Sequence, residues 1–241
     1  MLKKILISCS LFVFSHLCMA NVSVDINQKN FNFNSQPRLS EVISNVAHEA
    51  DWYWPAAKLY KLDTQDAPHL RDEIVTKLKL LQLSLSEERS IKISDLIEQI
   101  NSWQLADRIL IRLDYDLVQT NAQFDPLFDT GSYRLDLLER PRLINFFGLI
   151  EQASSAKLNT NQCIADYIHE QFSVLLNKDY IYVVQPNGHT FKAGIAYWNA
   201  SCVEIMPGSQ IYIPLDESQF SAENRELNKK IVKLALNRIL Q

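Results

Sequence analysis

Alternation of hydrophobic and polar residues dominates the first part of the chain. Hydrophobic residues fall on every second position of residues 22–26 and again at Phe31 and Phe33, which predicts two short, half-buried strands paired as a hairpin. In residues 39–50 they recur every three or four positions, the spacing of a short amphipathic helix. Two strands followed by one helix, with further strands later, indicate an α+β unit rather than a βαβ repeat.

Residues 66–105 have a helical pattern on both sides of a short break. Pro68 suits the first turn of a helix, and the aliphatic residues after it form one apolar stripe. A second stripe follows near residues 96–100, and no glycine interrupts the stretch. We therefore expect a helical hairpin inserted into the first domain. Strand patterns return at residues 109–113 and 133–138.

The charged, proline-containing segment 139–142 separates two hydrophobic runs and is the expected domain boundary. Beyond it the order of strand, helix and strands repeats. An Asn-Gly pair at residues 187–188 tolerates positive φ and predicts a hairpin turn. The expected elements are a strand at 143–148, a helix at 164–175, a strand at 180–184 and a last strand at 211–213. We predict a first domain over residues 21–140 and a second domain over residues 141–217.

A final amphipathic helix is expected within residues 218–241, from residue 224 onward. Leu227, Ile231 and Leu234 lie on its apolar side, and lysines occupy the opposite side. Two interpretations stay open. The apolar side packs on the second domain, which we favour, or it lies on a membrane or on a partner protein.

The first twenty residues have the three parts of a secretory signal peptide. Lys3 and Lys4 give a basic start, residues 5–17 form a mostly apolar run, and small residues end the segment at Ala20. The run is too short to cross a hydrocarbon layer about 30 Å thick, and no later stretch reaches the length of a transmembrane helix. We expect the mature protein to begin at Asn21, to be exported and to have no transmembrane segment.

Composition removes several classes of function. The five glycines are too few and too widely spaced for a Rossmann dinucleotide fingerprint, and none belongs to a phosphate-binding G-x-x-x-x-G-K loop. A formal net charge of −4 argues against general nucleic-acid binding. Hydrophobic residues make up 47% of the chain, enough to bury the core of one or two domains. We expect no cofactor and no nucleic-acid partner.

The four cysteines divide between the signal peptide and the mature chain. Cys9 follows a short sequence similar to a lipidation box, but the apolar run lies mainly beyond it, which disfavours a lipoprotein. Cys163 and Cys202 would remain in an oxidising compartment. A disulfide between them would close a loop of about 40 residues and stabilise the fold by ~4 kcal/mol through chain entropy. Two buried free thiols are an equal alternative.

Catalytic motifs are missing from the sequence. The histidines after the signal peptide are isolated, and no zinc-protease, serine-hydrolase or clustered Cys/His motif occurs. We expect no metal site and no enzymatic activity. Asp114, with Asp116 on the same side of an expected strand end, is the candidate for a carboxylate pair. A pair that caps a turn is the favoured alternative.

Three further residues are candidate ligand contacts. Trp54, in the densest aromatic group, and Trp198 have ring faces that can stack on sugars, although an aromatic residue just after a helix more often closes a core. Arg108 precedes an apolar strand, and its guanidinium cannot lose its charge, so an arginine drawn into a groove there would need an anion. A surface salt bridge to Asp107 or Asp114 is the alternative.

Short motifs with a distinctive composition are spread along the chain. They are Trp54-Pro55-Ala56-Ala57, Asp107-Arg108-Ile109 with Leu113-Asp114, Asp125-Pro126-Leu127 with Gly131, Ile144 to Gly148, Tyr197-Trp198-Asn199, and Pro207-Gly208 with Tyr212-Ile213-Pro214. In this order they resemble the GfcC family of periplasmic proteins of capsule and O-antigen polysaccharide biosynthesis. The resemblance covers most of the mature chain.

The resemblance implies two β-grasp domains, a helical hairpin inserted at about residues 66–105, and a C-terminal helix that folds back on the protein. It also implies kinship with the SLBB-like β-grasp domains of Wza-type outer-membrane polysaccharide exporters, and a place in the periplasm of a Gram-negative bacterium. Arg108 matches the cleft arginine of the family, but Asp107 replaces the glycine that precedes it. The resemblance supplies no catalytic residue.

The leading hypothesis is a monomeric, non-enzymatic accessory protein of polysaccharide assembly or export. It would bind glycan or a component of the outer-membrane export machinery, with Arg108 on an anionic group of the ligand and Trp54, Asp114 and Trp198 as further contacts. One alternative is a polysaccharide-modifying enzyme that uses Asp114. The other is a membrane-surface adaptor that acts through its C-terminal helix.

Overall fold

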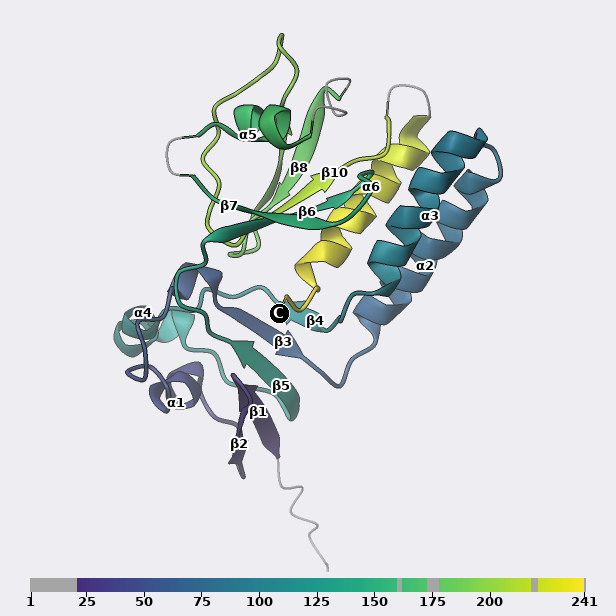
Figure 1. Ribbon diagram of the computed structural model, residues 1–241. Helices are drawn as coiled ribbons and strands as arrows, with labels where there is room; N and C mark the ends of the chain where they lie inside the picture. The colour runs from purple at the N-terminus through teal and green to yellow at the C-terminus, as the bar shows by residue number, and fades with distance from the viewer. Residues whose placement is uncertain (1–20, 160–161, 173–177, 218–220, 241) are drawn as a thin grey trace, which may run out of the picture.

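Two five-stranded sheets form the framework of the computed structural model, which describes residues 21–159, 162–172, 178–217 and 221–240 (Figure 1). The first sheet contains β1 (Val22–Ile26), β2 (Lys29–Phe33), β3 (Lys58–Lys61), β4 (Asp107–Ile109) and β5 (Gly131–Asp136). The second contains β6 (Leu143–Gly148), β7 (Ser154–Lys157), β8 (Tyr180–Val184), β9 (Thr190–Gly194) and β10 (Gln210–Ile213). The expected signal peptide lies outside the described residues.

The two sheets have the same topology. Their strand orders are β2-β1-β5-β3-β4 and β7-β6-β10-β8-β9, so both follow the order 2-1-5-3-4 when each is counted from its own first strand. In each sheet the first strand pairs parallel with the last, and the other neighbours pair antiparallel. The second half of the chain therefore repeats the architecture of the first half.

A short helix joins the second and third strands of each sheet. These helices are α1 (Leu39–Ser44) and α5 (Ile164–Gln171). Each buries its apolar residues against its own sheet, namely Leu39, Val42 and Ile43 in α1 and Ile164 and Ile168 in α5. A mixed sheet in this order with one helix across a face is the β-grasp fold, so the predicted α+β fold class is confirmed.

The predicted helical hairpin is present between β3 and β4 as α2 (Asp66–Gln82) and α3 (Glu87–Asn101). It does not cover the sheet into which it is inserted. Together with the C-terminal helix α6 (Ser221–Leu236) it forms a layer on the second sheet, on the face opposite α5 (Figure 1). This core includes Ile74, Leu78, Leu96 and Ile100 from the hairpin, Leu227, Ile231 and Leu234 from α6, and Phe147, Tyr182 and Tyr212 from the sheet.

Both faces of the second sheet are therefore buried, which explains its nearly continuous hydrophobic strands. Phe146 packs on the α5 side, and its neighbour Phe147 packs on the side of the three helices. Ile211 and Tyr212 divide in the same way, because successive side chains of a strand point to opposite faces.

The C-terminal helix is fixed to the sheet by one buried polar residue. Asn228 has no exposed surface, and its Oδ1 accepts hydrogen bonds from the Tyr212 hydroxyl (2.8 Å) and the Leu215 N–H (3.0 Å). Its Nδ2 donates to the Leu215 carbonyl (3.0 Å). The apolar side of α6 is thus packed on the second sheet, as favoured from the sequence, and a membrane or partner would not reach it. Among the described residues, no helix combines the length and the apolar character that crossing a bilayer requires.

Glu217 lies next to this contact and completes it. Its carboxylate accepts hydrogen bonds from Asn228 Nδ2 (3.0 Å), the Tyr182 hydroxyl (2.9 Å) and Lys192 Nζ (2.9 Å). Burial alone would raise the pKa of Glu217, but hydrogen bonds from Tyr180, Asn228, Lys192 and Tyr182 together outweigh it and lower the pKa to about 2. The carboxylate therefore stays ionised and links α6 to β8 and β9.

Some predicted boundaries are wrong. The strand expected at residues 109–113 is β4, which ends at Ile109, and an unpredicted helix α4 (Tyr115–Thr120) follows it. The apolar run misled the prediction because Ile111 and Leu113 contact the first core from a segment without regular structure. The helix expected at residues 39–50 ends at Ser44, and the helix expected at 164–175 ends at Gln171, with residues 173–177 outside the described residues.

Candidate functional site

Arg108 connects the two sheets. It lies on β4, and its guanidinium Nη2 donates to the carbonyl of Pro186, in the turn between β8 and β9. Its backbone N–H donates to Asn237 Oδ1 (2.9 Å), just after α6. Its Nε is buried and has no hydrogen-bond partner among the described residues. Where the structure describes the chain, Arg108 forms no salt bridge to Asp107 or Asp114, so that alternative is wrong.

Both neighbouring aspartates cap helices instead. The Asp107 carboxylate accepts hydrogen bonds from the N–H groups of Asp66 (3.1 Å) and Ala67 (2.6 Å) at the start of α2. Asp114 is the N-cap of α4, and its Oδ1 accepts from the Leu117 N–H (3.1 Å). The alternative favoured from the sequence, a cap rather than an acid–base pair, is thus the one found for Asp114. The strand end on which the candidate carboxylate pair depended is not there, because the segment begins a helix.

Two more cations lie near Arg108. Lys58, on β3, is only 5% exposed; its burial, with the nearby charge of Arg108, lowers its pKa to about 8, although Asp136 acts in the opposite direction. Arg238 contributes to the same lowering and lies over the Trp103 ring at 4.9 Å. Asp136 already accepts a hydrogen bond from Arg134 (2.6 Å). Positive charge is therefore in excess where the two sheets meet, a fact that the pattern of β3 did not reveal.

Trp54 is part of the first core. It begins a short 3-10 helix, Trp54–Ala56, and its half-buried ring packs against the buried residues of the first sheet. Trp54 therefore helps to close a core, which was the alternative to a ligand contact, and we assign no ligand contact to it.

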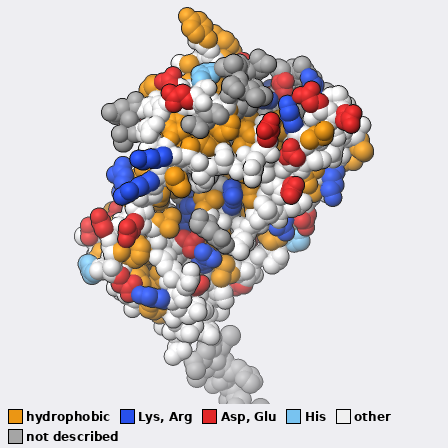
Figure 2. Space-filling model, viewed as in Figure 1, with side chains coloured by type: hydrophobic (Ala, Val, Ile, Leu, Met, Phe, Trp, Pro, Cys, Tyr) orange, Lys and Arg blue, Asp and Glu red, His pale blue; other side chains and the backbone are white. Residues whose placement is uncertain are grey.

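Trp198 has the opposite environment. It is 74% exposed, and its neighbour Tyr197 is fully exposed, on the loop that follows β9. Figure 2 shows hydrophobic side chains projecting from the top of the molecule, where this loop reaches its highest point in Figure 1. Sequence reasoning named Tyr197 only within a motif, because exposure of an aromatic residue cannot be read from its neighbours in sequence.

The loop that carries the two aromatic residues is held in place by its own hydrogen bonds. Asn199 Oδ1 accepts from the Ala196 N–H (2.9 Å), and Asn199 Nδ2 donates to the Asp179 carbonyl (2.8 Å). Gly194 leaves room for this arrangement, because a Cβ there would collide with the Asn199 carbonyl. Tyr197 and Trp198 are thus displayed by a fixed turn.

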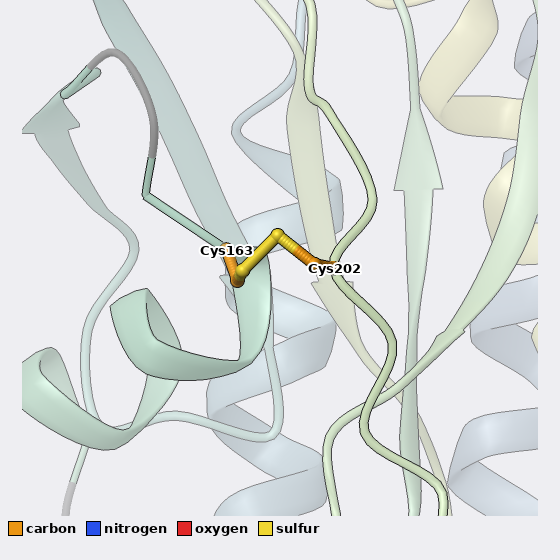
Figure 3. The surroundings of a disulfide bond; sticks show 2 residues. All are labelled: Cys163 and Cys202. Carbon is orange, nitrogen blue, oxygen red and sulfur yellow. A yellow bond between two sulfur atoms is a disulfide. The ribbon is translucent and has the colours of Figure 1, made fainter.

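A disulfide joins the next part of the loop to α5. Cys163 precedes α5 and is bonded to Cys202, with their Cα atoms 4.6 Å apart (Figure 3). Of the two alternatives left open by the sequence, the structure therefore has the disulfide rather than free thiols. The bridge closes a loop with a sequence separation of 39 residues and restrains the segment after Trp198.

A hollow of about 700 Å³ lies between this loop and α5. Its lining combines aromatic, acidic and small side chains: Ala165, Asp166, His169, Asp179, Ala196, Tyr197, Trp198 and Ala200. His169 is oriented by a 2.9 Å hydrogen bond between its Nε2 and the Ile195 carbonyl. Aromatic faces beside carboxylates can bind a sugar, because the rings take its apolar faces and the carboxylates accept hydrogen bonds from its hydroxyls.

The structure does not gather the sequence candidates into one site. Arg108 contacts the turn at one end of the β8–β9 hairpin, whereas Trp198 follows the opposite end of that hairpin. Asp114 caps α4, and Trp54 packs against the core of the first sheet. In the part of the chain that the structure describes, no group of three or more His, Cys, Asp or Glu residues could hold a metal ion.

The fold defines a class of protein with two β-grasp units, a helical insertion in the first and a C-terminal helix packed on the second. Family models of the N-terminal and C-terminal parts of the capsule biosynthesis protein GfcC match residues 19–140 and 152–240. The chain belongs to this GfcC family. A relative from Escherichia coli (strain K12), "Uncharacterized protein YjbG", is 33% identical over 195 residues, which cover 80% of this chain and 79% of the relative. The family places the protein in the context of capsule polysaccharide assembly.

Proposed function

We propose that the protein is a non-enzymatic, periplasmic accessory protein of surface polysaccharide assembly or export, and that it binds glycan in the hollow beside Tyr197 and Trp198. The family supports the polysaccharide context. The observation that carries the binding role is the exposure of two adjacent aromatic side chains on a fixed loop.

Exposed aromatic surface is unfavourable in water, and burying it would contribute about 25 cal/mol for each Å². The loop leaves both aromatic side chains exposed and so lacks this stabilisation, although the disulfide and the hydrogen bonds of Asn199 fix its backbone. A fixed platform loses little entropy when a ligand binds. Asp166 and Asp179 beside the rings provide acceptors for the hydroxyls of a sugar. These features together fit a saccharide better than an apolar ligand.

The sequence-based expectation that Arg108 contacts an anionic group of the ligand stays a prediction. Its unpartnered Nε and the excess charge of Lys58 and Arg238 favour an anion nearby. Its hydrogen bond to the Pro186 carbonyl also gives Arg108 a structural role, so a variant of Arg108 must be tested for stability as well as for ligand binding.

The experiment compares variants in a strain that lacks the native gene. Tyr197→Ala/Trp198→Ala should reduce both surface polysaccharide and the retention of the purified protein on that polysaccharide. Its thermal stability should stay unchanged because both side chains face solvent. Leu80→Ala/Leu83→Ala is the matched control, since these residues of the α2 region are also exposed and apolar. Normal surface polysaccharide after gene deletion, or turnover of the polymer by the purified protein alone, would contradict the proposal.

A further inference from the structure

A second hollow, of about 570 Å³, lies where the chain passes from the first sheet to the second. We call it the junction pocket. Its lining comes from the loop before β3, from the segment between β5 and β6, from the end of β7 and from the turn before β10. The lining residues are Asp51, Trp52, Tyr53, Glu139, Arg140, Pro141, Arg142, Lys157, Leu158 and Pro207. None of them lines the hollow beside Tyr197 and Trp198.

The junction pocket is lined by three cations that no carboxylate of the described residues neutralises. Arg140, Arg142 and Lys157 are exposed, and none forms an ion pair within residues 21–159, 162–172, 178–217 and 221–240. Figure 2 shows Lys and Arg side chains gathered at the left edge of the molecule, at the height where the segment between β5 and β6 runs in Figure 1. This local excess contrasts with the formal net charge of −4 of the whole chain.

The pocket also has aromatic walls. The Tyr53 ring has the Arg140 guanidinium over it, 5.3 Å from the ring centroid. This contact leaves the donors of the guanidinium free to bind an anion, because a cation over a ring binds the π system and not a hydrogen-bond acceptor. Trp52 is held by a hydrogen bond from its Nε1 to the Val46 carbonyl (2.8 Å).

Backbone contacts fix the walls relative to one another. The Tyr53 N–H donates to the Leu138 carbonyl (2.8 Å), and the Leu158 N–H donates to the Arg142 carbonyl (2.8 Å). The loop before β3 and the end of β7 are thus both tied to the segment that joins the sheets. The pocket is therefore preformed, and binding would require little reorganisation.

We propose that the junction pocket binds an acidic saccharide, a sugar unit that carries a carboxylate. The carboxylate pairs with the guanidinium of Arg142 or Arg140, and Lys157 adds a third positive charge. The sugar ring lies against the aromatic walls, and Asp51 and Glu139 accept hydrogen bonds from its hydroxyls. This inference rests on the proposed function, because it names the chemical class of the polymer that the protein handles.

An anionic membrane surface shares the negative charge of such a polymer, but the shape of the site argues against it. A membrane surface needs only exposed cations, whereas these exposed cations border a hollow of about 570 Å³ whose walls include Trp52 and Tyr53. We therefore commit to the saccharide and use the membrane as an outcome of the test.

The test measures binding of the purified mature protein to oligogalacturonate and to neutral malto-oligosaccharide of the same length, by isothermal titration calorimetry. Arg142→Ala/Lys157→Ala should weaken oligogalacturonate binding about tenfold or more, because charge-assisted hydrogen bonds are lost. Lys79→Ala/Lys233→Ala is the matched control: it also removes two exposed lysine or arginine charges, from α2 and α6, and should leave the affinity unchanged. Arg142→Lys should retain part of the affinity.

Three results would overturn the inference. They are equal binding of acidic and neutral oligosaccharides, unchanged affinity of the Arg142→Ala/Lys157→Ala variant, and binding to anionic vesicles that this variant alone abolishes. Failure of the proposed function has a different signature. In that case neither class of oligosaccharide binds, and Tyr197→Ala/Trp198→Ala leaves surface polysaccharide unchanged.

Discussion

Replacement of Asn228 by alanine is the sharpest test of how the C-terminal helix is held. The change removes the acceptor for the Tyr212 hydroxyl and the Leu215 N–H, and the donor to the Leu215 carbonyl and the Glu217 carboxylate. A buried polar group left without its partner costs about 1–3 kcal/mol. The three groups of Tyr212 and Leu215 give an expected loss of about 3–9 kcal/mol in the free energy of unfolding, with the lower end favoured if water enters the site.

The assay is urea denaturation followed by tryptophan fluorescence, because Trp103 lies in the core that α6 completes. Asn45→Ala is the matched control. Asn45 donates to the carbonyls of Glu41 and Val42 at an exposed helix end, so its loss should cost less than about 1 kcal/mol. If Asn228→Ala were as mild as this control, the reasoning that one buried amide secures the helix would be refuted.

The remaining predictions concern pH, caps and the disulfide. The pKa of Glu217 is 4.5 when unperturbed and about 2 in the fold, so its contribution to stability is complete above pH 4.5 and disappears as the pH falls towards 2. Glu217→Gln should therefore make the free energy of unfolding depend less on pH between 4.5 and 2. The pKa of Lys58 falls from 10.5 in the unfolded chain to about 8 in the fold, so the protonated side chain destabilises the fold at neutral pH. Lys58→Met should therefore raise the melting temperature at pH 7, and this gain should shrink as the pH approaches 10.5. Asp114→Asn should preserve both the cap of α4 and surface polysaccharide, whereas loss of the polymer with a folded protein would favour the enzyme alternative. Cys163→Ser/Cys202→Ser should lower stability by up to about 4 kcal/mol and weaken glycan retention, and a variant as stable as the native protein in urea would argue against that contribution.

Local patterns predicted much of the fold. Alternation located β1 and β2, helical spacing located α2, α3 and α6, and the Asn-Gly turn placed the hairpin of β8 and β9. These features depend on neighbours in sequence, which a pattern records. The apolar run that contains Ile111 and Leu113 was misread as strand because burial in a core does not require strand geometry.

Contacts between distant segments could not be predicted in this way. Nothing next to Arg108 in the sequence indicates that its guanidinium reaches Pro186, and nothing next to Lys58 indicates its burial near other cations. The junction pocket is assembled from segments more than one hundred residues apart, such as Trp52 and Lys157. The two tryptophans singled out from the sequence have opposite environments, because the exposure of Trp198 is set by Asn199 and the disulfide.

The helical layer on the second sheet has a consequence for how the protein acquires its structure. Its α2 and α3 come from the middle of the first β-grasp unit, yet they complete the hydrophobic core of the second. A fragment starting at residue 141 would leave the aromatic face around Phe147 and Tyr212 partly bare and prone to self-association. The two halves, though alike in topology, would thus fold as one cooperative unit, and its second core would be complete only when α6 has packed on the sheet.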